Sequence, residues 1–203
     1  MKYLAQKGIS LSPRIYFIDA LSYMALGLFS SLLMGLIVKT LGQQLGIESF
    51  VELGSFAMKP EIVGGAIGVA IASSLKAPPL ILFSAVFVGA FGNNIGGPAG
   101  AYISVLLAVE LAKLVYKTTK LDIILVPFTT FIIGFWVAKW IGIPISELMN
   151  GLGDMINWAT EQKPFVMSIL VATLMGLALT APISSAALSF MLGLEGLAAG
   201  AAV

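Results

Sequence analysis

The side chains best suited to hold a polar solute stand at interruptions in long apolar stretches. Asn93 and Asn94 lie in a glycine-rich turn that ends at Pro98, and Ala-Pro steps at Pro78 and Pro182 interrupt the apolar sequence elsewhere. An asparagine amide offers hydrogen-bond donors and an acceptor, and serine and threonine hydroxyls do the same, which suits a neutral polyol such as a sugar. The candidate binding residues at these places are Asn93, Asn94, Pro78, Thr180, Ser184, Ser185 and Glu195.

The proline motifs also have a purely structural explanation. The proline of an Ala-Pro step can simply occupy the first turn of a helix, and Ser184 and Ser185 can cap such a helix. The sequence leaves these two interpretations open. Glu195 has no basic residue nearby in the sequence, which favours a binding role, although it could instead lie in a loop.

Glu110 is a further candidate because it lies well inside an apolar segment. An ionisable side chain is costly there and is a functional candidate by default. Lys113 follows three residues later on the same helical face, so the two side chains can form a pair that reaches toward the cytoplasmic interface. For Glu110 the sequence favours this structural pair over a binding role.

The composition excludes several kinds of chemistry. The chain contains no cysteine and no histidine, so it lacks disulfides, thiolate nucleophiles, imidazole bases and the usual zinc ligands. No aspartate pair or Ser-Lys dyad has a convincing spacing. A net charge of +1 gives no indication of nucleic-acid binding. We therefore expect no catalytic residues, no metal, no cofactor and no enzymatic activity.

Membrane helices must position these residues. The chain is 59% hydrophobic and 10% charged, with a mean hydropathy of +1.01, which lies far outside the range of soluble proteins. Its apolar runs are continuous, and the longest approach the roughly 20 residues that a helix needs to cross a bilayer. We predict an all-α integral membrane protein of about 6–8 short transmembrane or re-entrant helices, with interfacial amphipathic helices in addition.

The expected segments follow one another closely along the chain. Residues 1–18 form a retained cytoplasmic tail along the membrane surface and not a signal peptide. The expected apolar segments are 20–38, 62–75, 78–91, 99–116 and 121–141, and residues 41–58 are expected to form one interfacial helix. The glycines at 27–35 and 64–68 are interpreted as helix-packing faces, and the tryptophans as interfacial anchors, namely Trp136, Trp140 and Trp158.

Lysine and arginine indicate the orientation. They concentrate in the N-terminal tail and at Lys113, Lys117 and Lys120, whereas the other loops are acidic. Because cytoplasmic loops of membrane proteins carry an excess of basic residues, the N-terminus is expected to face the cytoplasm.

Prolines that interrupt or begin helices recur at a fixed offset along the chain. Pro60 corresponds to Pro164 and Pro78 to Pro182, each 104 residues apart (164 − 60 = 104 and 182 − 78 = 104). This spacing predicts a duplication into repeats 19–120 and 121–203 that point the same way through the membrane. The alternative is independent use of proline and glycine at helix ends. The second unit stops without a counterpart of 99–116, so we expect the chain to be a fragment or a shortened version of a longer protein.

Four stretches together resemble one protein family. They are residues 16–29 (YFIDALSYMALGLF), 75–79 (LKAPP), 96–101 (GGPAGA) and 180–187 (TAPISSAA). They are similar to the EIIC-like membrane proteins of the bacterial phosphotransferase system, in the branch that includes the perfringolysin O regulator, and the resemblance covers essentially the whole chain. It implies a sugar-permease-like protein of the cell membrane that forms a homodimer and works with cytoplasmic phosphotransferase subunits.

The resemblance leaves two functions open. One is a permease that binds and translocates a small polar solute such as a sugar; the other is a membrane-embedded sensor or regulator that binds a solute without moving it. The phosphotransfer residues of the system are a cysteine and a histidine on separate cytoplasmic domains. This chain has neither residue, so it cannot carry a phosphoryl group by that route.

Overall fold

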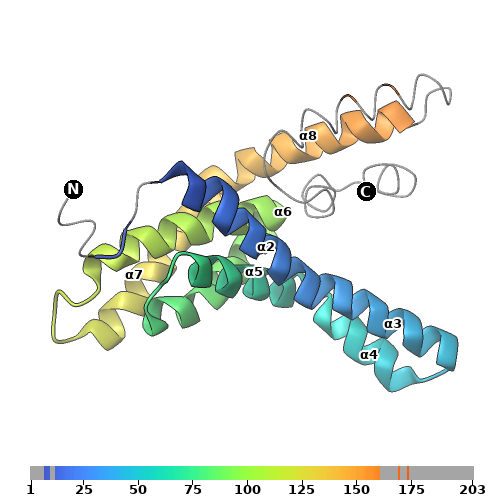
Figure 1. Cartoon of the computed structure of the whole chain (residues 1–203), viewed down its shortest axis with the longest axis horizontal. Coiled ribbons are helices and arrows are strands. Elements are labelled where there is room, and N and C mark those ends of the chain that lie inside the picture. Colours follow the sequence, from blue (N-terminus) through green and yellow to red (C-terminus); the bar gives the residue numbers. More distant parts are fainter. Residues whose placement is uncertain (1–6, 10–11, 161–168, 170–172, 174–203) are drawn as a thin grey trace.

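The computed structural model describes residues 7–9, 12–160, 169 and 173, and every regular element in this part of the chain is a helix (Figure 1). Three of the helices are long and apolar enough to cross a membrane, or four if the bent pair Glu48–Ala57 and Pro60–Ser74 forms one span. The all-α class is therefore observed for the described residues. The larger number of membrane segments expected from the sequence stays a prediction, because much of the second half lies outside the described part.

The first long helix runs without interruption from Ile15 to Leu45. It consists of two π-helical segments, Ile15–Asp19 and Phe29–Leu33, that alternate with α2 (Ala20–Leu28) and α3 (Met34–Leu45). Its 31 residues correspond to about 46 Å at roughly 1.5 Å per residue, which exceeds a hydrocarbon core of about 30 Å. The helix is thus longer than the expected segment 20–38.

A helical hairpin extends the first helix beyond the body of the molecule. Gly46 ends α3 in the left-handed conformation, with φ of 68°, which glycine adopts at low cost. The chain then returns as α4 (Glu48–Ala57) along α3, where a Cβ at Gly35 would meet the Gly54 oxygen at 2.9 Å. Figure 1 shows this hairpin projecting from the other helices. The prediction of one interfacial helix over 41–58 is therefore wrong, since the turn at Gly46 divides that range between two antiparallel helices.

The next two helices form the centre of the structure. α5 (Pro60–Ser74) follows α4 after a bend of 55°, and α6 (Pro79–Val115) contains a break at Gly96 and Gly97. The two arms of α6 fold back on each other, because a Cβ at Gly92 would lie 3.1 Å from the Ser104 hydroxyl. In a straight helix these positions, 12 residues apart (104 − 92 = 12), would be separated by about 18 Å. The predicted turn over 92–98 is confirmed only at Gly96 and Gly97, because residues 92–95 continue the first arm of α6.

The last described helices continue as one apolar unit. α7 (Asp122–Val137), a π-helical segment (Ala138–Gly142) and α8 (Ile143–Thr160) follow one another without a turn, so the expected segment 121–141 continues into α8. At the repeat offset of 104, Gly46 corresponds to Asn150, which lies inside α8. The first unit turns back where α8 continues, and the proposed repeat remains a prediction, because most of its landmarks after residue 160 lie outside the described part.

Small residues allow the central helices to pack closely. α5 and the first arm of α6 cross so tightly that a Cβ at Gly68 would lie 2.1 Å from the Ala85 oxygen, and one at Gly64 would lie 2.5 Å from the Gly89 oxygen. Gly27 of α2 approaches the backbone of α5 in the same way. The interpretation of these glycines as packing faces is confirmed.

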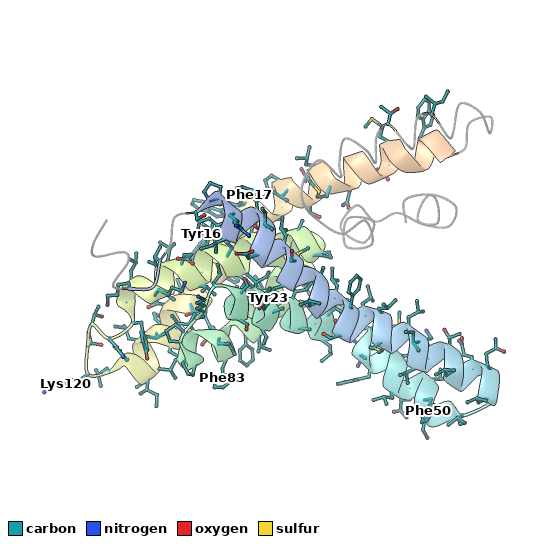
Figure 2. All side chains as sticks on the ribbon, in the orientation of Figure 1. Tyr16, Phe17, Tyr23, Phe50, Phe83 and Lys120 are labelled. Carbon is teal, nitrogen blue, oxygen red and sulfur yellow. The ribbon has the colours of Figure 1, made fainter. Side chains whose placement is uncertain are left out.

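Large apolar side chains point outward from this core. Figure 2 shows Phe17 and Phe83 directed away from the helices, and they are 61% and 65% exposed. Trp136, Trp140 and Trp158 are also exposed. Such a surface is unfavourable in water and is typical of contact with lipid. The role of the tryptophans as interfacial anchors remains a prediction.

Candidate functional site

The two predicted asparagines lie at the end of the first arm of α6, against the beginning of α5. The Asn93 side chain donates a hydrogen bond from Nδ2 to the Pro60 oxygen at 2.8 Å, and Asn94 Nδ2 lies 3.3 Å from Glu61 Oε1. Gly64 makes this approach possible, because a Cβ there would lie 2.6 Å from Asn93 Cβ. The glycine face of α5 therefore positions the amide of Asn93.

The Asn93 carbonyl oxygen is the notable atom of this site. Oδ1 is buried and has no hydrogen-bond partner among the described residues. Burial of an unpaired amide oxygen costs about 1–3 kcal/mol. Protein atoms cover Oδ1 in this structure, so a hydroxyl group from outside the chain could reach this acceptor only if they moved.

The helix break lies two residues beyond the asparagines. Gly97 has φ of 60° and ψ of −164°, a region that is essentially restricted to glycine. Apart from residues within four positions along the chain, no described residue has an atom within 4 Å of the position of a Cβ there. Pro98 follows and begins the second arm without an N–H group. Because helix ends leave backbone polar groups without intrahelical partners, the break places such groups beside the two amides.

The break is packed against the end of the π-helical segment that follows α7. A Cβ at Gly96 would meet the Gly142 oxygen at 2.8 Å, and one at Gly100 would lie 4.0 Å from Gly142 Cα. These glycines bring three stretches of backbone together at the interruption in α6. The arrangement matches the discontinuous helices that bind solutes in many transporters.

Pro78 does not join the asparagines. It is the N-cap residue of α6, and Pro79 occupies the first turn, so the helix-start interpretation accounts for this motif. α5 has 15 residues, or about 22 Å at roughly 1.5 Å per residue, and it separates Pro78 from Asn93. The prediction that these residues converge on one cavity is wrong for Pro78, because α5 and the first arm of α6 are antiparallel neighbours and Pro78 lies in their connection.

Glu110 and Lys113 form the predicted pair. Lys113 Nζ lies 2.9 Å from Glu110 Oε1, and the lysine side chain is only 2% exposed. The same ammonium donates to the Leu75 oxygen at 2.7 Å and to the Gly8 oxygen at 3.2 Å. Lys113 therefore connects the N-terminal segment, the end of α5 and the second arm of α6. Glu110 Oε2 is buried without a partner among the described residues.

Sequence reasoning missed three participants. Leu75 and Gly8 contribute only backbone oxygens. Every residue has such an oxygen, so the residue type does not indicate which one accepts a hydrogen bond. Glu61 is the acceptor of Asn94, and its position directly after the Lys59-Pro60 step at the start of an apolar helix was the signal that could have identified it.

The remaining candidates lie outside the described residues, namely Thr180, Ser184, Ser185 and Glu195. Within the part of the chain that the structure describes, no group of three or more acidic side chains could hold a metal ion.

Two open grooves run along the outside of the helices. One, of about 740 Å³, lies between α2 and α5 and is lined by small and apolar side chains together with Glu61, Ser30 and Tyr23. The other, of about 510 Å³, is lined by aromatic residues of α6 and α7, such as Phe87 and Phe131. Neither groove contains the asparagines. Glu61, however, connects the first groove to the site at the break.

Comparison with known proteins supplies the family. The family model described as "Phosphotransferase system, EIIC" matches residues 18–203. A comparison with curated proteins finds no match, and a comparison with solved structures finds none either. The match extends over nearly the whole chain and agrees with the long apolar helices, so the expected family is confirmed. The chain belongs to the EIIC family of the phosphotransferase system and is a membrane component of sugar transport.

Proposed function

We propose that this protein binds a small neutral polyol, such as a sugar, at the break in α6 and carries it across the cell membrane. The unpaired and buried Oδ1 of Asn93, beside the interruption at Gly96 and Gly97, is the observation that carries this proposal. A sugar hydroxyl can donate to that oxygen once the atoms that cover it move. Asn94 and Glu61 can bind other hydroxyls of the same sugar, because the hydrogen bond between their side chains is exposed.

The second half of the chain would complete the site. The repeat offset relates Pro182 to Pro78, so Thr180 before the second Ala-Pro step and Ser184 and Ser185 after it would lie at the end of the bundle opposite Asn93. Glu195 instead corresponds to Phe91 (195 − 104 = 91), close to Asn93. Broken segments at corresponding positions in two repeats commonly form a transporter's binding site. We include Glu195 in this half of the site. Glu110 is left out because its ion pair with Lys113 explains its presence.

The proposed orientation rests on charge. Lys76, Lys117 and Lys120 gather at the end of the structure opposite Asn93, and we name this group the basic end. Basic loops stay on the cytoplasmic side, so the N-terminus would face the cytoplasm and the break in α6 would lie toward the other side. Cytoplasmic phosphotransferase subunits would then approach the protein from the cytoplasmic side of the membrane, and we expect the functional protein to be a homodimer.

Calorimetry on the purified chain tests the binding site. A panel of sugars identifies the solute, and Asn94→Ala and Asn93→Ala are expected to weaken its binding by roughly 1–3 kcal/mol, or about 5- to 150-fold, because each removes a partner of a buried hydroxyl. Asn150→Ala is the matched control, since Asn150 is an exposed asparagine on α8. Gel filtration in detergent checks that each variant is folded. Equal affinities in all three variants would show that the asparagines only form the turn.

Uptake into proteoliposomes separates transport from sensing. A permease accumulates the labelled solute inside the vesicles, and the asparagine variants lower this uptake in proportion to their loss of affinity. Binding without any uptake, in the presence of the phosphotransferase subunits, would instead support a membrane-embedded sensor or regulator. That outcome would refute translocation while leaving the binding site intact.

A further inference from the structure

Two adjacent helices are each followed, two residues beyond their last residue, by a lysine whose backbone adopts the left-handed conformation. Lys76 follows α5 with φ of 54°, and Lys117 follows α6 with φ of 58°. In the described part of the chain they are the only residues other than glycine with positive φ. Glycine is favoured at this position because it has no Cβ, and Gly46 provides the comparison after α3. The two lysines therefore occupy positions where the backbone alone would select glycine.

The basic end brings these two lysines together with Lys120. Lys113 donates to the oxygen of Leu75, the residue before Lys76, and Lys117 lies two residues beyond the end of the helix that carries Lys113. Figure 2 shows the Lys120 side chain extending from the loop between α6 and α7. All three lysines of the basic end are exposed, so their charges lie on one accessible surface.

Nearby acidic groups neutralise this surface only in part, because Asp122 adds one negative charge beside three positive charges. The Asp122 carboxylate accepts hydrogen bonds from the backbone N–H groups of Lys117 and Thr119, and it thereby holds the loop in its conformation. Glu110 is paired with the buried Lys113. The Lys117 ammonium lies 5.4 Å from the centre of the Tyr116 ring. Among the described residues, no salt bridge involves a lysine of the basic end.

We propose that the basic end binds the headgroup of an anionic phospholipid through Lys76, Lys117 and Lys120. The lysines follow directly on apolar helices, so they lie at the depth of the lipid headgroups, and Tyr116 beside them is a residue typical of that boundary. Anionic headgroups attract lysines at this depth. A bound phosphate explains why lysine occupies these two left-handed positions. Glycine would relieve the strain of the backbone there, but it would also remove the ammonium group that binds the lipid headgroup.

Native mass spectrometry of the full chain in mild detergent provides the main test. The unmodified protein is expected to bind phosphatidylglycerol more tightly than phosphatidylcholine. Lys76→Gly and Lys117→Gly are each expected to lower phosphatidylglycerol affinity about fivefold, the factor that corresponds to about 1 kcal/mol for one charge near an anionic surface. Lys76→Arg retains the charge and is expected to retain the affinity. Lys59→Gln, which removes an exposed charge before α5 at the other end, is expected to change nothing.

Thermal unfolding distinguishes a lipid site from a structural role of the lysines. Without added lipid, both glycine variants are expected to unfold at a higher temperature than the unmodified protein, because they relieve the left-handed conformation. Phosphatidylglycerol then stabilises the unmodified protein more than either variant. Glycerol phosphate in solution is expected to have no such effect, since it lacks the acyl chains that hold the headgroup at the basic end.

Three results would overturn the proposal. Equal affinity of the unmodified protein for phosphatidylglycerol and phosphatidylcholine would show that the basic end has another partner, such as an acidic cytoplasmic protein. Undiminished phosphatidylglycerol binding in the double variant Lys76→Gly/Lys117→Gly would place the lipid elsewhere. A lower unfolding temperature of the glycine variants without lipid would show that the lysines serve the fold. None of these results depends on the binding of a sugar.

Discussion

The buried ammonium of Lys113 offers the sharpest test of how the helices are held together. Lys113→Met keeps an unbranched side chain of similar length but removes all three hydrogen-bond donors. The Leu75 and Gly8 oxygens then lose their donor. The Glu110 carboxylate, with one oxygen already unpaired, loses its only described partner for the other.

The size of the effect follows from these contacts. Removal of one member of a buried ion pair typically costs about 3–5 kcal/mol, because the other charge remains buried and uncompensated. Glu110→Gln is milder, at about 1–2 kcal/mol, since Lys113 keeps both backbone acceptors and the new amide oxygen can still accept. The double variant carries no buried charge. It is therefore expected to be more stable than Lys113→Met alone, with a coupling energy of about 2 kcal/mol.

Unfolding in mixed micelles measures these differences. Titration with sodium dodecyl sulfate, followed by circular dichroism, yields the free energy of unfolding for the unmodified protein, both single variants and the double variant. Lys139→Met is the matched control: Lys139 is an exposed lysine whose ammonium lies over the Phe135 ring, and its loss should cost less than about 1 kcal/mol. The reasoning is refuted if Lys113→Met costs no more than this control, or if the costs of the two single variants simply add in the double variant.

Two further predictions concern packing and topology. Gly68→Ala should lower the free energy of unfolding by about 1–3 kcal/mol or more, because the new Cβ would lie 2.1 Å from the Ala85 backbone oxygen. Gly65→Ala should cost less than about 0.5 kcal/mol, because its Cβ would meet a side-chain methyl of Val86 at 3.2 Å and the Val86 backbone oxygen at an ordinary 3.6 Å. Similar unfolding temperatures of the two variants would contradict the close crossing. Because the chain contains no cysteine, Lys59→Cys and Lys163→Cys can be labelled singly with an impermeant maleimide, and both should react from the non-cytoplasmic side; reaction from opposite sides would disprove the parallel repeat.

Features that depend on neighbouring residues were predicted well. The turn over 92–98 was recognised from its glycines and proline, and the break at Gly96 and Gly97 lies within it. The pair of Glu110 and Lys113 was recognised from its spacing on one helical face. The break and the ion pair both depend on local conformation, which glycine, proline and the helical spacing of residues indicate directly.

Features that depend on where one helix ends were predicted less well. The amphipathic pattern of residues 41–58 predicts one helix because it continues through Gly46, although the chain reverses there. Because broken segments often meet in a transporter, the Ala-Pro step predicts that Pro78 lies beside the asparagines, whereas it lies at the other end of α5. Residue types do not indicate at which end of two antiparallel helices a given loop lies, so they could not place Pro78 at the end opposite Asn93.

By itself, the sequence determined that this is a helical membrane protein with polar groups at its interruptions, because hydropathy and helix-breaking residues act over short distances along the chain. Only the tertiary structure decided which of these groups meet. Asn93 reaches Pro60 because Gly64 permits the close crossing of α5 and α6, and Lys113 reaches Gly8 across 105 residues of chain. Such pairings depend on the position and angle at which helices cross, and these are set by packing between segments that are distant in the sequence.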